Sequence, residues 1–224
     1  MLSVIIPTLN ESPQIAETVA CTRALGACEI IVVDGGSTDD TRARAAGADR
    51  VLVTERGRAL QMNAGAAAAS GDVLLFLHAD CRPEPGAFAA VAAALDDPRT
   101  VGGCFRQAIE AGGWRYRLME RGNALRVRLL GWAYGDQGIF VRRQVFHELG
   151  GFPRVPLMED LLFMKRLKRR GRIRLLDARL HVSARRWQRS GVVRQTLRNW
   201  TLIAALHAGV SPDRLARFYP AVRG

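Results

Sequence analysis

Apolar residues in the first hundred positions form short runs, separated by stretches with helical spacing. Four runs predict strands, at 3–6, 29–33, 50–53 and 73–77. The stretches between them predict helices, at 14–25, 38–46, 59–70 and 86–95. Strands that alternate with helices are typical of a parallel sheet with right-handed crossovers. We therefore predict an α/β, Rossmann-like fold, with a mostly parallel central sheet and helices on both faces.

Beyond residue 100 the pattern is looser and predicts a mixture of helices and strands. The predicted strands are at 102–108, 138–141 and 173–176, and the predicted helices are at 114–130, 142–149, 160–170 and 192–208. A chain of 224 residues with 48% hydrophobic content can bury one substantial core. We expect a single domain over residues 1–224, with two functional halves at 1–100 and 101–224.

The segment from Gly71 to Cys81 places polar side chains directly after a buried strand. His78 and Asp80 follow the apolar run 73–77, and ligands bind at that edge of an open α/β sheet. A carboxylate there suits Mg²⁺ or Mn²⁺, whose other ligands are substrate phosphates and water. Alternatively, Asp80 only caps the turn at 83–85. This segment alone does not decide between the two interpretations.

A glycine pair follows the second predicted strand, in the sequence Asp34-Gly35-Gly36-Ser37-Thr38. Paired glycines form a tight turn, and a turn that leads into a helix can bind an anion. At the strand end, Asp34 is placed to hydrogen-bond a base or a ribose. A dinucleotide fingerprint would instead put Gly-x-Gly-x-x-Gly after the first strand, where this chain has Pro-Thr-Leu-Asn-Glu. The sequence therefore argues against a dehydrogenase.

Charge is distributed unevenly along the chain. The net charge is −5 for residues 1–100, +3 for 101–160 and +14 for 161–224. A basic region of this kind attracts nucleic acid, an anionic membrane face or a phosphorylated small molecule. The chain has no recognition-helix motif, and its acidic first half would repel a phosphate backbone, so nucleic acid is the least favoured of these partners.

Four cysteines without close spacing favour a reducing, cytoplasmic environment. The chain starts directly with an apolar strand pattern, which predicts no secretory signal. No apolar run reaches the length of about 18 residues expected of a membrane span.

The order of the motifs resembles family 2 glycosyltransferases of the GT-A fold, the nucleotide-diphospho-sugar transferase fold. The matching elements are Pro-Thr-Leu-Asn-Glu after strand one, Val-Asp-Gly-Gly-Ser after strand two, Asn63 and Gly65 in an Ala-rich helix, and His-Ala-Asp at 78–80. The chain is most similar to small bacterial-type members that carry His-Ala-Asp where most have Asp-x-Asp. The resemblance implies transfer of a sugar from a nucleotide-diphosphate donor, with inversion. The donor would bind to residues 1–100 and the acceptor to residues 101–224, which end in basic helices.

The resemblance also implies a set of donor-binding residues. By position they are Pro7, Thr8 and Glu11 along the nucleoside, Asp34 and Gly35 at the base or ribose, Arg58 near the donor, and His78, Ala79 and Asp80 at the diphosphate. Asp80 would bind the divalent cation, Mn²⁺ or Mg²⁺. Gly35 stands where many relatives have a carboxylate that reads uracil, so the donor base stays open. His78 and Ala79 replace acidic residues, which predicts weak binding of the cation without donor.

Acidic residues in the second half are candidates for catalysis and acceptor binding. The resemblance places Glu159 and Asp160 beside the acceptor hydroxyl, and a carboxylate is needed there to accept its proton. We expect Asp160 to be the general base. Alternatively, the pair only stabilises a helix N-terminus. Asp136 and Gln137, in a Gly-Asp-Gln-Gly turn, would contact the acceptor or simply close a hairpin.

The sequence Arg185-Arg186-Trp187 resembles the Gln-x-x-Arg-Trp element of processive relatives. The resemblance implies that Arg185 and Arg186 face the diphosphate, with Arg186 assisting catalysis, and that Trp187 borders the acceptor. Two guanidinium groups can neutralise the charge of the leaving group. His181 is either a further metal ligand or a packed residue.

The last predicted helix carries an apolar stripe formed by Val193, Leu197, Trp200, Ala204 and His207. Such a stripe more often docks on the core of its own domain than on a membrane. Membrane binding would imply a lipid-linked acceptor and a peripheral position on the inner membrane face. The alternative function is a nucleotide-sugar-binding protein with little or no turnover. The sequence leaves open the sugar, the nucleoside, the acceptor and whether the chain forms a homo-oligomer.

Overall fold

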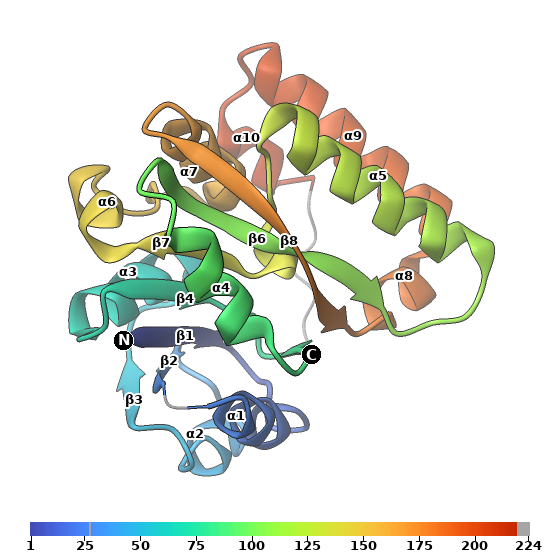
Figure 1. Ribbon diagram of the computed structural model, residues 1–224. Coiled ribbons are helices and arrows are strands. Elements are labelled where there is room, and N and C mark those ends of the chain that lie inside the picture. The colour runs from blue at the N-terminus through green and yellow to red at the C-terminus, as the bar shows by residue number, and fades with distance from the viewer. Residues whose placement is uncertain (27, 219–224) are drawn as a thin grey trace.

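Eight strands form one curled, mixed sheet in the computed structural model, which describes residues 1–26 and 28–218 (Figure 1). The strands are β1 (Leu2–Thr8), β2 (Glu29–Asp34), β3 (Arg50–Val53), β4 (Val73–Phe76), β5 (Cys81–Pro83), β6 (Thr100–Ile109), β7 (Ile139–Arg142) and β8 (Arg172–Val182). Their order is β3-β2-β1-β4-β7-β6-β8-β5. Four of the seven pairings are parallel, and those of β7 with β4 and β6 and of β5 with β8 are antiparallel. The predicted mostly parallel α/β sheet is confirmed.

Helices cover both faces of this sheet, as predicted. They are α1 (Ile15–Ala24), α2 (Thr41–Arg44), α3 (Arg58–Ala68), α4 (Ala87–Leu95), α5 (Trp114–Leu130), the 3₁₀ turn η1 (Gly135–Gln137), α6 (Arg143–Glu148), α7 (Glu159–Lys168), α8 (Arg185–Ser190), α9 (Val192–His207) and α10 (Pro212–Ala216). One apolar cluster packs α1 and α4 on the sheet, and a second packs α3, α6 and α7 on the other face. The side chains of Arg186, Arg189, Ser190, Val192 and Val193 lie outside the description.

The central strands are apolar on both sides because both of their faces are covered. In β1, Val4 and Ile6 belong to one cluster and Ile5 to the other, and none of the three is exposed. Successive side chains of a strand point to opposite faces, so each cluster receives alternate residues. This arrangement explains why the run shows no polar alternation.

The sheet curls so that β5 returns to its far end. β5 comes directly after the loop that ends β4, yet it pairs with β8. The predicted strand at 173–176 is therefore only part of β8, which continues to Val182 after a register shift opposite Phe105 and Arg106. The polar residues Asp177 and Arg179 interrupt the apolar pattern there, which is why the sequence underestimates the strand.

Helix α9 presents part of its predicted stripe to solvent. Leu197 is 61% exposed and Trp200 is 72% exposed, whereas the opposite side of the helix buries Gln195 and Leu202. The prediction that the stripe docks on the core is therefore wrong for these two residues, and the Val193 side chain lies outside the description. Within residues 1–26 and 28–218, no helix combines the length and the apolar character needed to cross a bilayer.

Candidate active site

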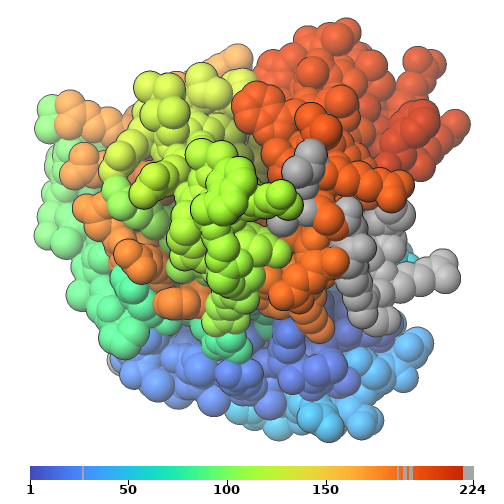
Figure 2. All heavy atoms as spheres, turned by 90° about the vertical axis from the view of Figure 1, so that its right-hand side faces the viewer, coloured from blue at the N-terminus to red at the C-terminus, as the bar shows by residue number. Residues whose placement is uncertain are grey.

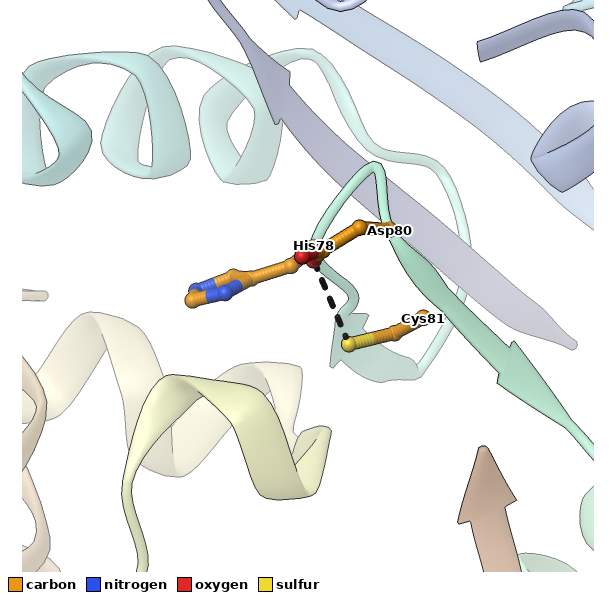
Figure 3. A group of neighbouring side chains, drawn as sticks. All are labelled: His78, Asp80 and Cys81. Atoms are coloured by element: carbon orange, nitrogen blue, oxygen red, sulfur yellow. Dashed lines mark hydrogen bonds between the residues drawn. The ribbon is translucent and has the colours of Figure 1, made fainter. Parts of the chain in front are cut away.

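The loop between β4 and β5 brings three potential metal ligands together. Ligand atoms of His78, Asp80 and Cys81 all lie within 4.8 Å of one another (Figure 3). The Cys81 amide closes the turn by donating to the His78 carbonyl at 3.1 Å. Between the ligands, Ala79 is buried, and its carbonyl accepts a hydrogen bond from the Thr18 hydroxyl at 2.5 Å. The loop is therefore held by contacts on both of its sides.

Cys81 supports Asp80 as a protonated thiol. Burial raises the pKa of Cys81 well above its ordinary value, and the charges of Asp80 and Asp136 raise it further. The thiol donates to Asp80 Oδ1 at 3.7 Å.

Residues from three distant segments converge at Gly135. The Gly135 amide donates to Asp160 Oδ2 at 2.8 Å, and the Leu161 amide donates to Asp160 Oδ1 at 2.7 Å. A Cβ atom at position 135 would lie 2.5 Å from His78 Nε2 and 3.6 Å from Asp160 Oδ2. Glycine, whose side chain is a single hydrogen atom, is therefore the residue that fits between His78 and Asp160. Asp160 and the loop that carries Asp80 thus border the same space.

An ion pair ties α3 to the start of α7 beside this space. Arg58 Nε lies 2.8 Å from Glu159 Oε1, and the Glu159 side chain is 3% exposed. Burial raises the pKa of Glu159, the Arg58 charge opposes that rise, and the Asp160 charge adds to it. Met158, directly before the acidic pair, has a left-handed backbone with φ of 68°. This conformation is unfavourable for a residue with a side chain, and such strain is concentrated at functional sites.

Replacing Arg58 by Ala should destabilise the fold by about 2 kcal/mol, or roughly 4–8 °C in Tm, because it leaves Glu159 buried without its cation. This is less than for a fully buried pair, since Arg58 is 39% exposed. The loss should be largest at neutral pH. It should shrink as pH falls through the raised pKa of Glu159, where the carboxyl becomes neutral. Thermal unfolding at several pH values, with the exposed Arg56→Ala as control, measures this; an equal loss at all pH values would contradict it.

The loop after β2 corrects the role predicted for Asp34. Asp34 is fully buried and accepts hydrogen bonds from the Gly36 amide at 3.0 Å, the Ser37 amide at 2.8 Å and the Ser37 hydroxyl. Its carboxylate therefore holds the turn and does not face a base or ribose. The sequence could not distinguish the two roles, because both place a carboxylate at a strand end.

Gln61 was not predicted, although it forms the floor beneath Gly35. Its Nε2 donates to the carbonyls of Thr8 at 2.7 Å and Val33 at 2.8 Å. A Cβ atom at position 35 would lie 3.0 Å from Gln61 Cδ, so a larger residue would have to displace this side chain. No sequence signal separates Gln61 from the other polar residues of a helix.

The loop after β1 lies beside α8. Pro7 and Thr8 are buried, and Arg185 approaches Glu11 with a distance of 3.7 Å between Nη2 and Oε2. The structure therefore brings Glu11 and Arg185 together across 174 positions of the sequence. The role predicted for Arg186 falls on a side chain outside the described residues.

Two predicted acceptor contacts are wrong because the side chains are buried. Gln137 is unexposed, and its Oε1 accepts from Arg126 at 2.6 Å and from the Tyr134 amide at 3.2 Å, so it holds the η1 turn. Trp187 is 7% exposed and belongs to the apolar cluster that also contains residues of α1 and α4. Asp136 keeps partial exposure and accepts from Gln107 Nε2 at 2.9 Å.

His181 does not join the potential metal ligands. It lies opposite Arg82 in the β5–β8 pairing, whereas Cys81 lies opposite Val182. Neighbouring residues of a strand point to opposite faces, so His181 and Cys81 face different sides. The ligand cluster found within the described part of the chain contains His78, Asp80 and Cys81, and His181 is corrected to a non-ligand.

The sequence of residues 3–150 matches the family described as Glycosyl transferase family 2. The chain belongs to glycosyl transferase family 2. A related protein is the undecaprenyl-phosphate 4-deoxy-4-formamido-L-arabinose transferase of Sodalis glossinidius (strain morsitans), which is 30% identical over 155 residues. That match covers 63% of this chain and 48% of the relative, so the chain spans about half the length of the curated relatives it matches.

Solved structures confirm the GT-A fold of this family 2 glycosyltransferase. S. aureus TarS 1-349 in complex with UDP-GlcNAc has a TM-score of 0.65 and 20% identity, covering 81% of this chain and 58% of that one. The Pyrobaculum calidifontis mannosyltransferase PcManGT, in complex with GDP-Man and Mn²⁺, has a TM-score of 0.62 and 21% identity, covering 80% and 56%. Both structures are complexes with nucleotide sugars.

The residues at the Asp80 edge of this family 2 member fit a divalent cation. Asp80 is partly exposed and offers a carboxylate, and a His78 nitrogen lies within 4.8 Å of it. Carboxylate and imidazole are ordinary ligands for ions such as Mn²⁺. Cys81 contributes instead through its hydrogen bond to Asp80 while its thiol is protonated.

Proposed function

We propose that this glycosyltransferase moves a sugar from a nucleotide-diphosphate donor to an acceptor hydroxyl, with inversion at the anomeric carbon and Asp160 as the general base. The convergence of His78 and Asp160 on Gly135 supports this proposal most strongly. It puts a carboxylate from the second half of the chain next to the loop that carries Asp80. A transferase requires such an arrangement, because donor and acceptor must meet in one place.

The donor half would bind the nucleotide and its diphosphate. In this proposal the partly exposed Glu11 lies along the nucleoside, and the buried Pro7 and Thr8 shape the loop beneath it, beside the turn containing Gly35. A Mn²⁺ or Mg²⁺ ion held by Asp80 and His78 would offset the charge of the diphosphate. Many relatives have a carboxylate at the position of Gly35. Such a side chain would crowd Gln61 in this chain, so the base of the donor need not be uracil.

Two arginines are placed to stabilise the departing diphosphate. Arg58 lies at the start of α3 and Arg185 lies across from Glu11, so both flank the loops of the donor half. As the bond between the anomeric carbon and the diphosphate oxygen breaks, that oxygen keeps the electron pair. Guanidinium groups stabilise such charge through charge-assisted hydrogen bonds.

Asp160 would accept the proton of the acceptor hydroxyl while the new carbon–oxygen bond forms. Two backbone amides fix its carboxylate, and each oxygen keeps a further lone pair for the hydroxyl proton. A positioned carboxylate of this kind contributes typically about 10²–10⁴-fold to the rate. Asp136, partly exposed in the neighbouring turn, would bind the acceptor.

A lipid-linked acceptor and a peripheral position at the membrane form part of the proposal. The related S. glossinidius protein is named an undecaprenyl-phosphate transferase, which supports an acceptor with a lipid carrier. That relative is about twice as long as the matched region.

A panel of UDP, GDP, CDP and ADP sugars tests the proposed function. We expect one nucleoside diphosphate to raise Tm, and to do so more strongly with Mn²⁺ than without it. The corresponding sugar nucleotide should release its nucleoside diphosphate during incubation with extracts of bacterial glycolipids. Binding without release, for every donor and extract, would contradict the proposal and favour a nucleotide-sugar-binding protein.

A further inference from the structure

Helices α5 and α9 expose large apolar side chains on one side of the molecule. Both views place them side by side, and Figure 2 shows yellow-green α5 and orange-red α9 on the face turned to the viewer. The Thr196 hydroxyl of α9 lies 4.0 Å from the Met119 sulfur of α5. The most exposed are Trp114 (70%), Leu118 (60%), Leu125 (55%) and Leu129 (67%) on α5, with Leu197 (61%) and Trp200 (72%) on α9. Leu130, at the end of α5, is 40% exposed.

The exposed residues of α5 form one stripe. Positions 114, 118, 125 and 129 recur at intervals of four, seven and four residues, which places them on one side of a helix. Val127, on the other side, is buried. The helix therefore has a second apolar side that the core does not use, and contiguous exposed apolar surface of this kind marks an interaction site.

The charged residues of the two helices that carry the stripe are almost all arginines. The sequences of α5 and α9 contain seven arginines, and Glu120 is their one acidic residue. The Glu120 side chain is 15% exposed and is paired with Arg117 at 3.0 Å. The exposed charge on this side is therefore positive.

A groove of about 540 Å³ runs along α5, between that helix and the β6–β8 pair. Its lining includes Arg106, Arg117, Arg121, Arg128, Arg179 and Leu125. Arg106 pairs with Asp177 at 3.0 Å. In the part of the chain that the structure describes, the guanidinium groups of Arg121, Arg128 and Arg179 have no ion-pair partner. The groove therefore offers three uncompensated cations beside the apolar stripe.

We propose that the α5–α9 side docks on an anionic lipid bilayer, with phosphate headgroups in the arginine groove and the apolar stripe in the headgroup–acyl boundary. A nucleic acid would satisfy the arginines but leave the tryptophans and leucines in water. A second copy of the chain would bring arginine against arginine. An anionic membrane surface matches both the apolar and the cationic parts.

The proposed docking side is connected to the acceptor side of the active site. Leu202 of α9 packs against Leu157, which is followed directly by Met158 and the acidic pair. Docking would hold this part of the site near the bilayer and its lipid-borne molecules. The link to a lipid-linked acceptor rests on the proposed function, but membrane docking can be tested without any turnover.

Sedimentation with vesicles tests the proposal directly. We expect the protein to bind phosphatidylcholine vesicles that contain phosphatidylglycerol and not vesicles of phosphatidylcholine alone, with binding weakened by salt. Soluble glycerol phosphate at the same phosphate concentration should not displace it. Leu118→Gln with Leu125→Gln, and separately Arg121→Glu with Arg128→Glu, should each weaken vesicle binding by about tenfold or more.

The matched control is Arg42→Glu with Arg44→Glu on α2, which changes the same net charge on exposed arginines elsewhere. This control should bind vesicles nearly as well as the unchanged protein, and all variants should keep their Tm. If the α2 control weakens vesicle binding equally, the loss comes from net charge alone. That result would overturn the proposal that the α5–α9 side is the docking surface. Absence of vesicle binding, or a stable dimer lost in the Leu118 and Leu125 variant, would also overturn it. None of these results depends on sugar transfer.

Discussion

Replacing Asp160 by Asn should lower sugar transfer by about 10²–10⁴-fold, because the acceptor hydroxyl loses the group that takes its proton. Binding of the donor nucleotide should stay nearly unchanged, since in the proposed mechanism Asp160 contacts the acceptor and not the donor. The amide retains one oxygen acceptor, so one of the two bonds to the Gly135 and Leu161 amides weakens. That loss should cost only about 1 kcal/mol of stability. Initial rates at saturating donor, together with nucleotide affinity, measure the effect.

The control for Asp160 is Asp213→Asn in the first turn of α10, which removes the same charge from another helix start. It should leave the transfer rate unchanged. If the Asp160 variant keeps a substantial part of its activity, Asp160 only stabilises the start of α7.

Replacing Asp80 by Asn should weaken the cation-dependent binding of the donor by about 10–100-fold and reduce transfer to background. Asp80 is the carboxylate of the His-Ala-Asp loop, and Ala79 offers no substitute for it. Titrations of the nucleoside diphosphate with and without Mn²⁺ separate the two contributions. The difference between these titrations should disappear in the variant.

Asp72→Asn is the matched control for Asp80, because Asp72 precedes the same strand at its other end. Asp72 is exposed and pairs with the N-terminus at 3.1 Å. Its replacement should leave the effect of Mn²⁺ intact. Cys81→Ser, which keeps a donor to Asp80 Oδ1, should preserve most of the nucleotide affinity. Retention of the full Mn²⁺ effect in the Asp80 variant would mean that the cation binds elsewhere.

The sequence predicts the first half of the fold well because its strands are buried on both faces. The side chains of a run such as Val4 to Ile6 pack alternately into the two apolar clusters. Every position of the run is therefore apolar, and the strand is easily recognised in the sequence. β5 leaves no such signal, since it is three residues long and pairs with a strand about a hundred positions away. The second half of β8 is missed because Asp177 and Arg179 interrupt its apolar pattern.

Among the site residues, motif position identifies the loops more reliably than it identifies each side chain. Asp160 lies close to the loop that contains Asp80, as predicted by their motifs. Asp34 and Gln137, in contrast, use their polar atoms in hydrogen bonds that hold their own turns. Only the structure shows this, because Arg126 reaches Gln137 from another helix, and Ser37 reaches Asp34 only in the folded turn. Gly135 was predicted as part of a turn, whereas its fit between His78 and Asp160 is a property of three segments together.

Helix α9 shows a similar limit for amphipathic patterns. Its apolar stripe indicates a side that avoids water, but the periodicity does not say what covers that side. The helix buries Leu202 against Leu157 and leaves Trp200 exposed. The packing of α9 beside α5 and against the segment before α7 determines which of its residues are buried.

The position of Mn²⁺ in crystals grown with a nucleoside diphosphate tests the central claim most directly, since anomalous scattering locates this ion. We expect the ion within coordination distance of the Asp80 carboxylate, a diphosphate between the ion and Arg58 or Arg185, and Asp160 facing the open side. An ion and nucleotide bound away from Asp80, with that carboxylate still hydrogen-bonded to the Cys81 thiol, would contradict this expectation.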